Sequence, residues 1–561
     1  MQEGKNSGKI LAMYDVRGIQ NFIFRTNKVK EIMGASRIVE DIIESALEHG
    51  LREKGIPKEQ YILTWEHDVE LEILSDENED IVAQVLFIGG GNAYVMYKDR
   101  ELAVEINKKM ARYVLDEAYS LQLAVAMVAK TESYKEDYQS VQREMARIKA
   151  SMPCYSGCLG ATSVVAVDDM SGFPYNSIDS MEDLKGKPEY GSSLSYESIQ
   201  KLSAYYRNYK EGEEKIHDNL ITQYKEESIL AVVHIDGNNM GMRIRTLMEN
   251  VPDYAEAVKK MRSISKNINY SFKETFESTR NFIQEWVESP ANKVLKKEQK
   301  GQKAQYIRKI LVAGDDITFI CNARLALPIV QYFTQEVTGK VMFGESTEEN
   351  LREYGFSVCA GIAYVHSHFP FHTAYEVAEE CCSSAKKRAK EDGRKENDRI
   401  GNWVDFQICK SVHNIDLEKS REKNYRLAEE EWLLRRPYYL EVTHPSYTDF
   451  NETNEKYSYE NFERIMDYFT DKSVMPHSLA KEFRNTYPLG RNAVEELIEF
   501  AKSRGKLGEK IEKETQTEAE NTPGFVMLDG KCTAAWYDAL EMMDYYIKIK
   551  QGKEKSGVKE A

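Results

Sequence analysis

The sequence lacks any long apolar run, which excludes a chain that crosses a membrane as a helix. No stretch of its 561 residues approaches the roughly 20 apolar residues that a transmembrane helix needs. Residues 1–9 are polar and have no apolar core of the kind found in signal peptides. We therefore expect a cytoplasmic protein with no membrane partner.

Glycine and proline are sparse, at 32 and 13 residues, and hydrophobic residues make up 42% of the chain. This composition is typical of globular proteins and excludes a disordered or fibrous chain. The length is too great for one hydrophobic core, and a size of roughly 150 residues per domain predicts three or four domains.

Cysteine is also scarce, because eight residues scattered over the chain form no disulfide framework. We expect reduced thiols. Cys154 and Cys158 alone have the spacing of a metal-binding pair, but a zinc site needs four ligands and no second pair follows. The sequence thus favours small buried thiols over zinc ligands and leaves the role of this pair open.

The chain has no excess of positive charge, since its formal net charge is −16. Binding of nucleic acid requires clustered Lys and Arg to neutralise phosphates. The balance therefore argues against a large nucleic-acid surface of the chain's own but leaves local basic patches possible, and we expect any contact with RNA to be made mostly through partner proteins.

The sequence does contain a predicted hairpin with two acids at its tip. Apolar residues at 310–312 and 317–320 have the composition of buried strands, and Gly314 provides the tight turn between them. The turn carries Asp315 and Asp316, whose carboxylates repel each other unless a cation lies between them. Hard divalent cations take oxygen ligands and share them with substrate phosphates, so the turn predicts a site for Mg²⁺ or Mn²⁺. An ordinary solvated turn is the alternative reading.

The order of predicted elements repeats. A strand at 10–16, a hairpin with its turn at 89–92, a strand at 121–129 and the intervening helices form one β-α-β-β-α-β-α unit. A second unit follows from a strand at 229–235. Asp15 lies about 75 residues before the first hairpin turn and Asp236 about 78 before the second. Matching order and spacing predict an internal duplication with an α+β fold.

The two repeats differ in their acids. In a β-α-β-β unit the first strand is a sheet neighbour of the hairpin, so Asp236 is expected to face Asp315 and Asp316 as a third metal ligand and catalytic residue. The following loop carries small residues and free backbone N–H groups that suit phosphates, and its nucleotide-binding candidates are Gly237, Asn238, Asn239 and Gly241. The first hairpin turn, 89–92, has no acid, which predicts one active unit and one degenerate unit.

Taken together, the motifs resemble the large subunit of type III CRISPR effector complexes, a family with two palm domains related to nucleotide cyclases. The motifs are Asp15-Val16-Arg17-Gly18-Ile19-Gln20-Asn21-Phe22-Ile23, Gly89-Gly90-Gly91-Asn92, Asp236-Gly237-Asn238-Asn239-Met240-Gly241, Ala313-Gly314-Asp315-Asp316, and the run 368–380 that leads to Ala385-Lys386. They cover about residues 8–410.

The resemblance implies two ferredoxin-like palm domains, the first at 8–167 and the second at 228–410, joined by a loop-rich connector at 168–227. It implies that the second palm converts ATP into cyclic oligoadenylates or couples AMP to another acceptor, with Mg²⁺ or Mn²⁺ held by Asp236, Asp315 and Asp316. Gly314 and Lys386 would contact the nucleotide. Other type III subunits and guide RNA are the implied partners, and a homo-oligomer is compatible with the sequence.

Three departures from the family pattern stand out. Ala313 replaces the first glycine of the usual Gly-Gly-Asp-Asp turn and would resist a positive φ. Asn238 replaces a frequent second acid. The chain begins directly with the first palm, so we expect a form without the HD nuclease domain that DNase-active members carry.

Residues 411–561 are expected to form an α-helical C-terminal domain without a catalytic motif, with helices at 417–435, 459–469, 478–486, 493–503 and 533–550.

Two other functions compete with the synthetase. One is a structural large subunit of a guide-RNA complex in which the palm chemistry is reduced, favoured by Ala313 and Asn238. The other is a templated polymerase, which also uses Gly-Asp-Asp hairpins but needs a basic template channel that this acidic chain does not offer.

Overall fold

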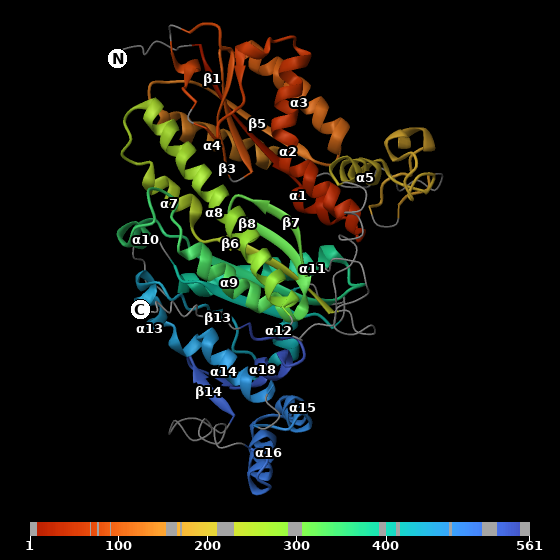
Figure 1. Ribbon diagram of the computed structural model, residues 1–561, viewed down its shortest axis with the longest axis vertical. Helices are drawn as coiled ribbons and strands as arrows, with labels where there is room; N and C mark the ends of the chain where they lie inside the picture. The colour runs from red at the N-terminus through yellow and green to blue at the C-terminus, as the bar shows by residue number, and fades with distance from the viewer. Residues whose placement is uncertain are drawn as a thin grey trace, which may run out of the picture.

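Two sheets of the computed structural model have the strand order that a duplicated unit requires (Figure 1). The structure describes residues 8–67, 69–75, 78–89, 91–152, 165–168, 171–209, 229–289, 306–391, 400–410, 416–470, 474–507 and 524–549. Figure 1 shows the first unit at the top, the second in the middle and the C-terminal region at the bottom.

The first unit is a five-stranded sheet with helices, in the order β2-β3-β4-β1-β5. The apolar run of β1 lies between β4 and β5 and is buried. The elements are β1 (Ile10–Arg17), α1 (Ile19–Phe24), α2 (Val29–Glu53), β2 (Tyr61–Ile62), β3 (Ala83–Gly89), β4 (Asn92–Tyr97), α3 (Arg100–Ala118), β5 (Gln122–Ala129) and α4 (Tyr134–Ser151).

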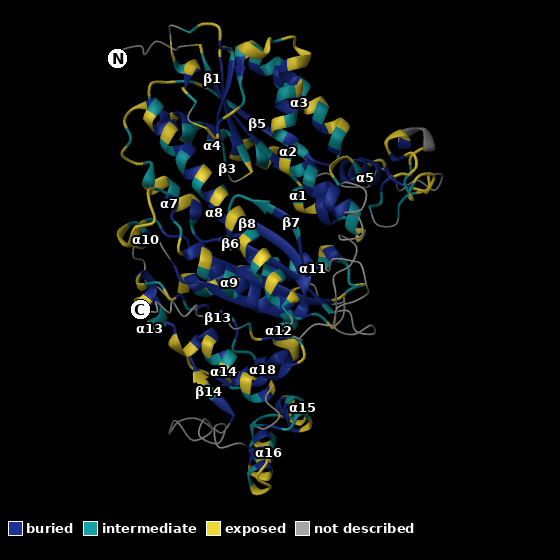
Figure 2. Ribbon diagram, viewed as in Figure 1, coloured by how far each residue is buried: buried dark blue, intermediate teal, exposed yellow. Residues whose placement is uncertain are grey.

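The second unit is a six-stranded sheet in the order β13-β10-β9-β6-β8-β7. Its strands are buried on the inside while the outer faces of the helices are exposed (Figure 2). The elements are β6 (Ile229–Gly237), α7 (Met240–Leu247), α8 (Tyr254–Glu288), β7 (Ile307–Ala313), β8 (Asp316–Asn322), α9 (Ala326–Thr338), α10 (Glu348–Tyr354), β9 (Val358–His366), α11 (Phe371–Glu391) and β10 (Trp403–Ile408), with β13 (Tyr438–Tyr439) added at the edge.

Each unit contains four antiparallel strands in the same spatial order. The order β3-β4-β1-β5 in the first corresponds to β7-β8-β6-β9 in the second, and each neighbouring pair is antiparallel. The predicted β-α-β-β-α-β-α element order is therefore confirmed in both halves.

The units pack on each other reciprocally. The outer strand of each hairpin has one register shift, at Leu86 in β3 and at Ile310 in β7. Each shifted residue turns its carbonyl toward the other unit: Arg262 of α8 donates to Leu86 O, and Ser36 of α2 donates to Ile310 O. Arg262 also donates to Val69 O at 2.6 Å. The same bulge position in both repeats is thus used for the same interface.

The connector is less loop-rich than the sequence predicts. Helix α5 (Tyr196–Asn208) packs on α2, where an added Cβ on Gly34 would lie 1.8 Å from Lys201 O. The two backbones are in contact at this crossing, which explains the glycine. Lys201 is buried and pairs with Glu197 at 2.7 Å. Residues 169–170 and 210–227 of the predicted connector lie outside the described part.

The C-terminal region contains helices, as predicted, and also a sheet that the sequence analysis did not predict. Helices α12 (Leu417–Tyr425), α13 (Thr448–Thr453), α14 (Tyr459–Thr470), α15 (His477–Thr486), α16 (Arg491–Ser503) and α18 (Tyr537–Met542) accompany a four-stranded sheet. Its order is β11 (Arg426–Ala428), β12 (Glu431–Trp432), β15 (Lys531–Ala534) and β14 (Phe525–Leu528). The predicted helix at 417–435 ends at Tyr425, and the one at 533–550 is replaced by strand β15 and the short α18.

The missed hairpin has a local sequence cue. Asp529 and Gly530 adopt φ values of 49° and 79° between β14 and β15, and an Asp-Gly pair with positive φ is a preferred two-residue hairpin turn. The pairing of β12 with β15 has no such cue, because it joins segments about 100 residues apart.

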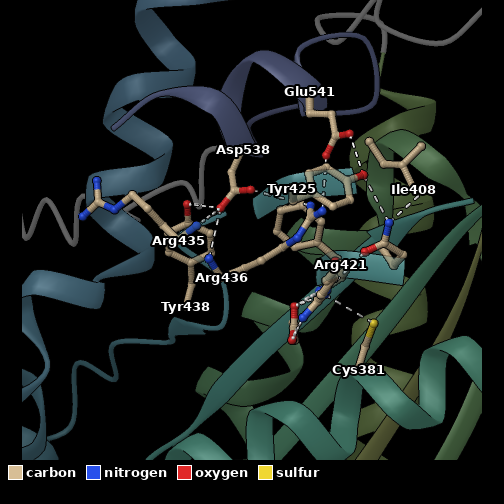
Figure 3. Close-up of polar contacts among 12 residues, drawn as sticks. Cys381, Ile408, Arg421, Tyr425, Arg435, Arg436, Tyr438, Asp538 and Glu541 are labelled. Atoms are coloured by element: carbon tan, nitrogen blue, oxygen red, sulfur yellow. Dashed lines mark hydrogen bonds and ion pairs between the residues drawn. The ribbon is translucent and has the colours of Figure 1, made fainter. Parts of the chain in front are cut away.

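A buried network of charges joins the C-terminal region to the second sheet (Figure 3). The Arg436 guanidinium lies 3.3 Å from Glu541 Oε2 and 3.8 Å from Asp538 Oδ1, both on α18. Arg421 of α12 donates to both carboxylate oxygens of Asp405 in β10 at 2.8 Å. These side chains are at most 12% exposed. Because buried charges depend strongly on their partners, the network fixes α18 against the sheet.

No helix in the described ranges is long and apolar enough to span a membrane.

Candidate active site at the ends of β6 and β8

The predicted acids meet where two neighbouring strands end. In the antiparallel pair β6–β8, Ile235 lies opposite Ile317, which places Asp236 beside Asp316. Gly314 takes the positive φ of the turn, 64°. Ala313 instead lies in β7 and pairs with Asp316, so the alanine that departs from the family pattern carries no backbone strain.

Gly237 is required by the acid opposite it. A Cβ on Gly237 would lie 2.7 Å from Asp315 Oδ2 and 2.9 Å from Met240 Cγ. The carboxylate of Asp315 therefore packs directly on the backbone at the end of β6. This close approach explains the glycine at 237 without any contact to a phosphate.

A histidine supports Asp316 from inside the sheet. His234 Nδ1 lies 3.3 Å from Asp316 Oδ1 and 3.2 Å from Thr318 Oγ1, and the ring is buried. Asp316 Oδ1 accepts no hydrogen bond from the described residues. Sequence reasoning missed His234. The cue was its place two residues before Asp236, because alternate residues of a strand share one face.

Lys386 reaches the site from α11. Its ammonium pairs with Asp236 Oδ2 and lies 3.5 Å from Gly237 O. The family resemblance implies that this lysine contacts the nucleotide, and in the structure it neutralises an acid of the predicted metal site. The attraction of Asp236 raises the pKa of Lys386 although burial opposes it.

The acids repel one another strongly. Burial and the nearby charge of Asp236 raise the pKa of Asp315 to about 6 and that of Asp316 to about 8. Glu379 of α11 adds to the repulsion on Asp316, and burial raises the pKa of Glu379 as well. Burial lowers the pKa of His234 to about 4, so this ring is neutral at pH 7. A bound cation would relieve the repulsion.

The donor set suits a hard cation, although it is not assembled as a closed cage. Across the described ranges, no three His, Cys, Asp or Glu side chains are grouped closely enough to hold a metal ion. Mg²⁺ commonly takes only one or two carboxylates and completes its shell with water and substrate phosphates. The Asp316 side chain is 33% exposed, as such an open site requires.

Other predicted loop residues lie differently. Asn238 is only 1% exposed and donates to Gly401 O at 3.1 Å, so it ties β6 to the segment before β10. Its predicted contact with a nucleotide does not fit this burial. Asn239 adopts φ 55° at the start of α7, and Gly241 is exposed on the first turn of that helix. Cys154 and Cys158 lie outside the described residues.

The first unit keeps the ion pair and loses the other acids. Asp15 lies opposite Asn92, which has the hairpin position of Asp316, and pairs with Lys149. Lys149 follows the first residue of α4 by 15 positions, as Lys386 follows that of α11. By the same count Gln142 stands where α11 has Glu379. In addition to the acid-free turn at 89–92, a neutral residue thus stands in place of Glu379 in the first unit.

The raised pKa values predict how pH changes the stability of the metal-free protein. Unfolded aspartate titrates near pH 3.9, so between about pH 4 and about pH 8 the folded site holds more protons than the unfolded chain. Its contribution to stability is then lost as pH rises. Between about pH 5 and about pH 8, we expect the melting temperature of the wild type to fall by about 2–4 °C relative to an Asp315→Asn/Asp316→Asn variant.

Differential scanning calorimetry in a chelating buffer measures this difference. Added Mn²⁺ should cancel it at about pH 8 by binding only the folded state. Equal melting-temperature differences at both pH values would contradict the proximity of the acids.

One comparison with known proteins matches the segment that carries these residues. Residues 229–397 match the family model described as Cas10/Cmr2, second palm domain. No curated protein matches the chain.

Several solved structures resemble it at low identity. The apo Csm1–Csm4 cassette has TM-score 0.46 and 13% identity, covering 97% of this chain and 71% of that chain. The cassette in complex with cA4 has TM-score 0.39 and 13% identity, covering 82% and 62%. The cassette in complex with one ATP has TM-score 0.39 and 13% identity, covering 72% and 55%.

In the latter two comparisons this chain spans less than two thirds of the matched chain. At these values the likeness does not by itself establish a shared fold. The family match covers the segment that holds Asp236, Asp315, Asp316 and Lys386. Residues 229–397 therefore belong to the Cas10/Cmr2 second palm domain family, which confirms for this segment the resemblance to the large subunit of type III CRISPR effector complexes.

Proposed function

We propose that this chain is a type III large subunit whose second palm domain is a divalent-metal-dependent nucleotidyltransferase acting on ATP. Its products would be cyclic oligoadenylates or related AMP-containing messengers of antiviral defence. The observation that carries the proposal is the meeting of Asp236, Asp315 and Asp316 at adjacent strand ends within the matched segment.

The domain organisation that goes with this function is a degenerate first palm at 8–167, a connector at 168–227, an active second palm at 228–410 and a C-terminal domain at 411–561. Support comes from the shared strand order of the two units and the loss of acids in the first. Other type III subunits and guide RNA are the proposed partners, and the cytoplasm the proposed location.

The residues have distinct roles in this proposal. Asp236, Asp315 and Asp316 would hold Mg²⁺ or Mn²⁺, which supplies charge neutralisation at the triphosphate when bound. Gly237 keeps the Asp315 carboxylate at the strand end, and Gly314 forms the turn that brings it there. Lys386 neutralises Asp236 and lies where it can transfer to a phosphate oxygen. His234 holds Asp316 from the buried side.

The test is incubation of the chain, with the proteins and RNA that copurify with it, in ATP and Mg²⁺ or Mn²⁺. Pyrophosphate release and adenylate oligomers in mass spectrometry are the expected results. Absence of pyrophosphate from all four nucleoside triphosphates with either metal would overturn the enzymatic proposal.

A catalytically reduced structural subunit is the second candidate. Two observations favour it: Lys386 already neutralises Asp236, and no preassembled three-ligand cage is present among the described residues. An intact complex with guide RNA in which the acids can be replaced without any change in product would support this alternative.

A further inference from the structure

The first unit contacts α11, the helix that packs beside His234 and Asp316, through the short helix α1. Gln20 of α1 donates from Nε2 to the Tyr375 hydroxyl on α11 at 2.7 Å, across 355 residues of sequence. Phe24, also on α1, stacks on the same tyrosine ring, with centroids 4.4 Å apart and 15° between the planes. Just beyond the end of α1, Asn27 Oδ1 accepts from the backbone N–H of Phe371 at 2.9 Å. Three contacts thus hold the start of α11 against the first unit.

Tyr375 in turn packs on the histidine behind Asp316. Its ring is 3% exposed and meets His234 edge-on, with centroids 5.6 Å apart and an interplanar angle of 78°. Rotation of His234 about its side-chain bonds is therefore blocked on the side of α11. On its other side His234 Nδ1 faces Asp316 Oδ1 and Thr318 Oγ1. His234 therefore contacts both Tyr375 and Asp316.

Gln20 also reaches the acid that follows on α11. It hydrogen-bonds Glu379, one helical turn after Tyr375, and this bond opposes the rise in the pKa of Glu379 that burial causes. The same amide thus contacts two α11 side chains that border the cluster. Gln20 itself is exposed, so its replacement leaves the hydrophobic core intact.

The chain of contacts is specific to the second unit. Counting from the start of each helix, Tyr138 of α4 corresponds to Tyr375. Two residues before Asp15 stands Met13, where the second unit has His234 before Asp236. The first unit therefore has the tyrosine without the histidine and without the acid that the histidine would orient.

We propose that Gln20 of the first unit is a positioning residue for the divalent cation of the second, acting through Tyr375 and His234 on Asp316. The inference rests on the proposed function, because it assumes that Asp316 binds the cation. It assigns the degenerate unit a role in the active centre that requires no acid of its own.

The test measures binding of Mn²⁺ alone by electron paramagnetic resonance, which needs no turnover. In Gln20→Met and in Tyr375→Phe, the dissociation constant of Mn²⁺ should rise by about twofold to fivefold, the effect expected from losing one hydrogen bond. The double variant should bind no more weakly than the weaker single variant, because both changes break the same bond. Melting temperatures should stay within about 2 °C of wild type.

Gln142→Met is the matched control, since Gln142 donates in the same way to a tyrosine, Tyr94, but within the first unit. It should leave the Mn²⁺ dissociation constant unchanged. Unchanged affinity in Gln20→Met, or an equal loss in Gln142→Met, would overturn the positioning role. Equal affinities of wild type and Asp316→Asn would contradict the metal centre itself and so both proposals, whereas a loss in Asp316→Asn alone would contradict only the role of Gln20.

Discussion

Replacing Asp315 and Asp316 by asparagine will lower the metal-dependent release of pyrophosphate from ATP by at least about 10³-fold. Asparagine keeps the shape of each side chain and removes the charge that a divalent cation needs. Removal of one electrostatic contact at a reacting centre costs about 10²–10³-fold, and two such contacts are lost here. Initial rates measured with a coupled pyrophosphate assay, with Mg²⁺ and with Mn²⁺, check this result.

The same double variant should be more stable than the wild type in the absence of metal. The two carboxylates lie beside Asp236, and their charged forms are disfavoured by burial and by mutual repulsion. A rise in melting temperature together with a loss of activity would separate the chemical effect from unfolding. The control is Glu348→Gln/Glu349→Gln, which removes two exposed charges at the start of α10 and should leave the rate within about twofold of wild type.

Asp538→Ala will destabilise the C-terminal region by about 3–5 kcal/mol, the cost of removing one partner from a buried ion pair. Asp538 Oδ2 accepts from Arg435 N at 2.9 Å, from Arg436 N at 3.0 Å and from the Tyr438 hydroxyl at 2.9 Å. Its loss leaves these donors and the Arg436 guanidinium buried with one anion fewer (Figure 3). Urea titration of the full chain measures the change in the free energy of unfolding.

Asp467→Ala provides the comparison for this variant. Its carboxylate pairs with Lys548 at 2.7 Å, but the two side chains are 50% and 37% exposed. Exposed pairs contribute about 0–1 kcal/mol, so this variant should unfold close to wild type. Equal effects of Asp467→Ala and Asp538→Ala would show that burial does not govern the network.

The elements of the two units were predictable because their strands and helices have clear periods. The acid pair was predictable for a topological reason: an antiparallel neighbour brings Asp236 beside Asp316 wherever the β-α-β-β order holds. The contact between Gln20 and Tyr375 was not predictable from the sequence. The two residues are 355 positions apart, and neither lies in an unusual local pattern.

In the C-terminal region, local sequence preference gave a wrong prediction. Residues 426–432 include good helix formers, and their intrinsic preference predicts a helix that continues beyond Tyr425. The structure instead pairs β12 with β15, a strand supplied from about 100 residues away. Long-range pairing outweighed local propensity there. The burial of Asn238 could not be predicted for a related reason, because its partner Gly401 follows it by 163 residues.

The paired bulges at Leu86 and Ile310 have a consequence for symmetry. A homodimer of identical units would carry every change in its hairpin twice, so losing the acids of one turn would mean losing both. In this chain the bulge carbonyls are held by different donors, Arg262 on one side and Ser36 on the other. Covalent linkage fixes the ratio of the two units at one to one. Both units can therefore keep their contacts across the interface while only one of them keeps the acids of the site.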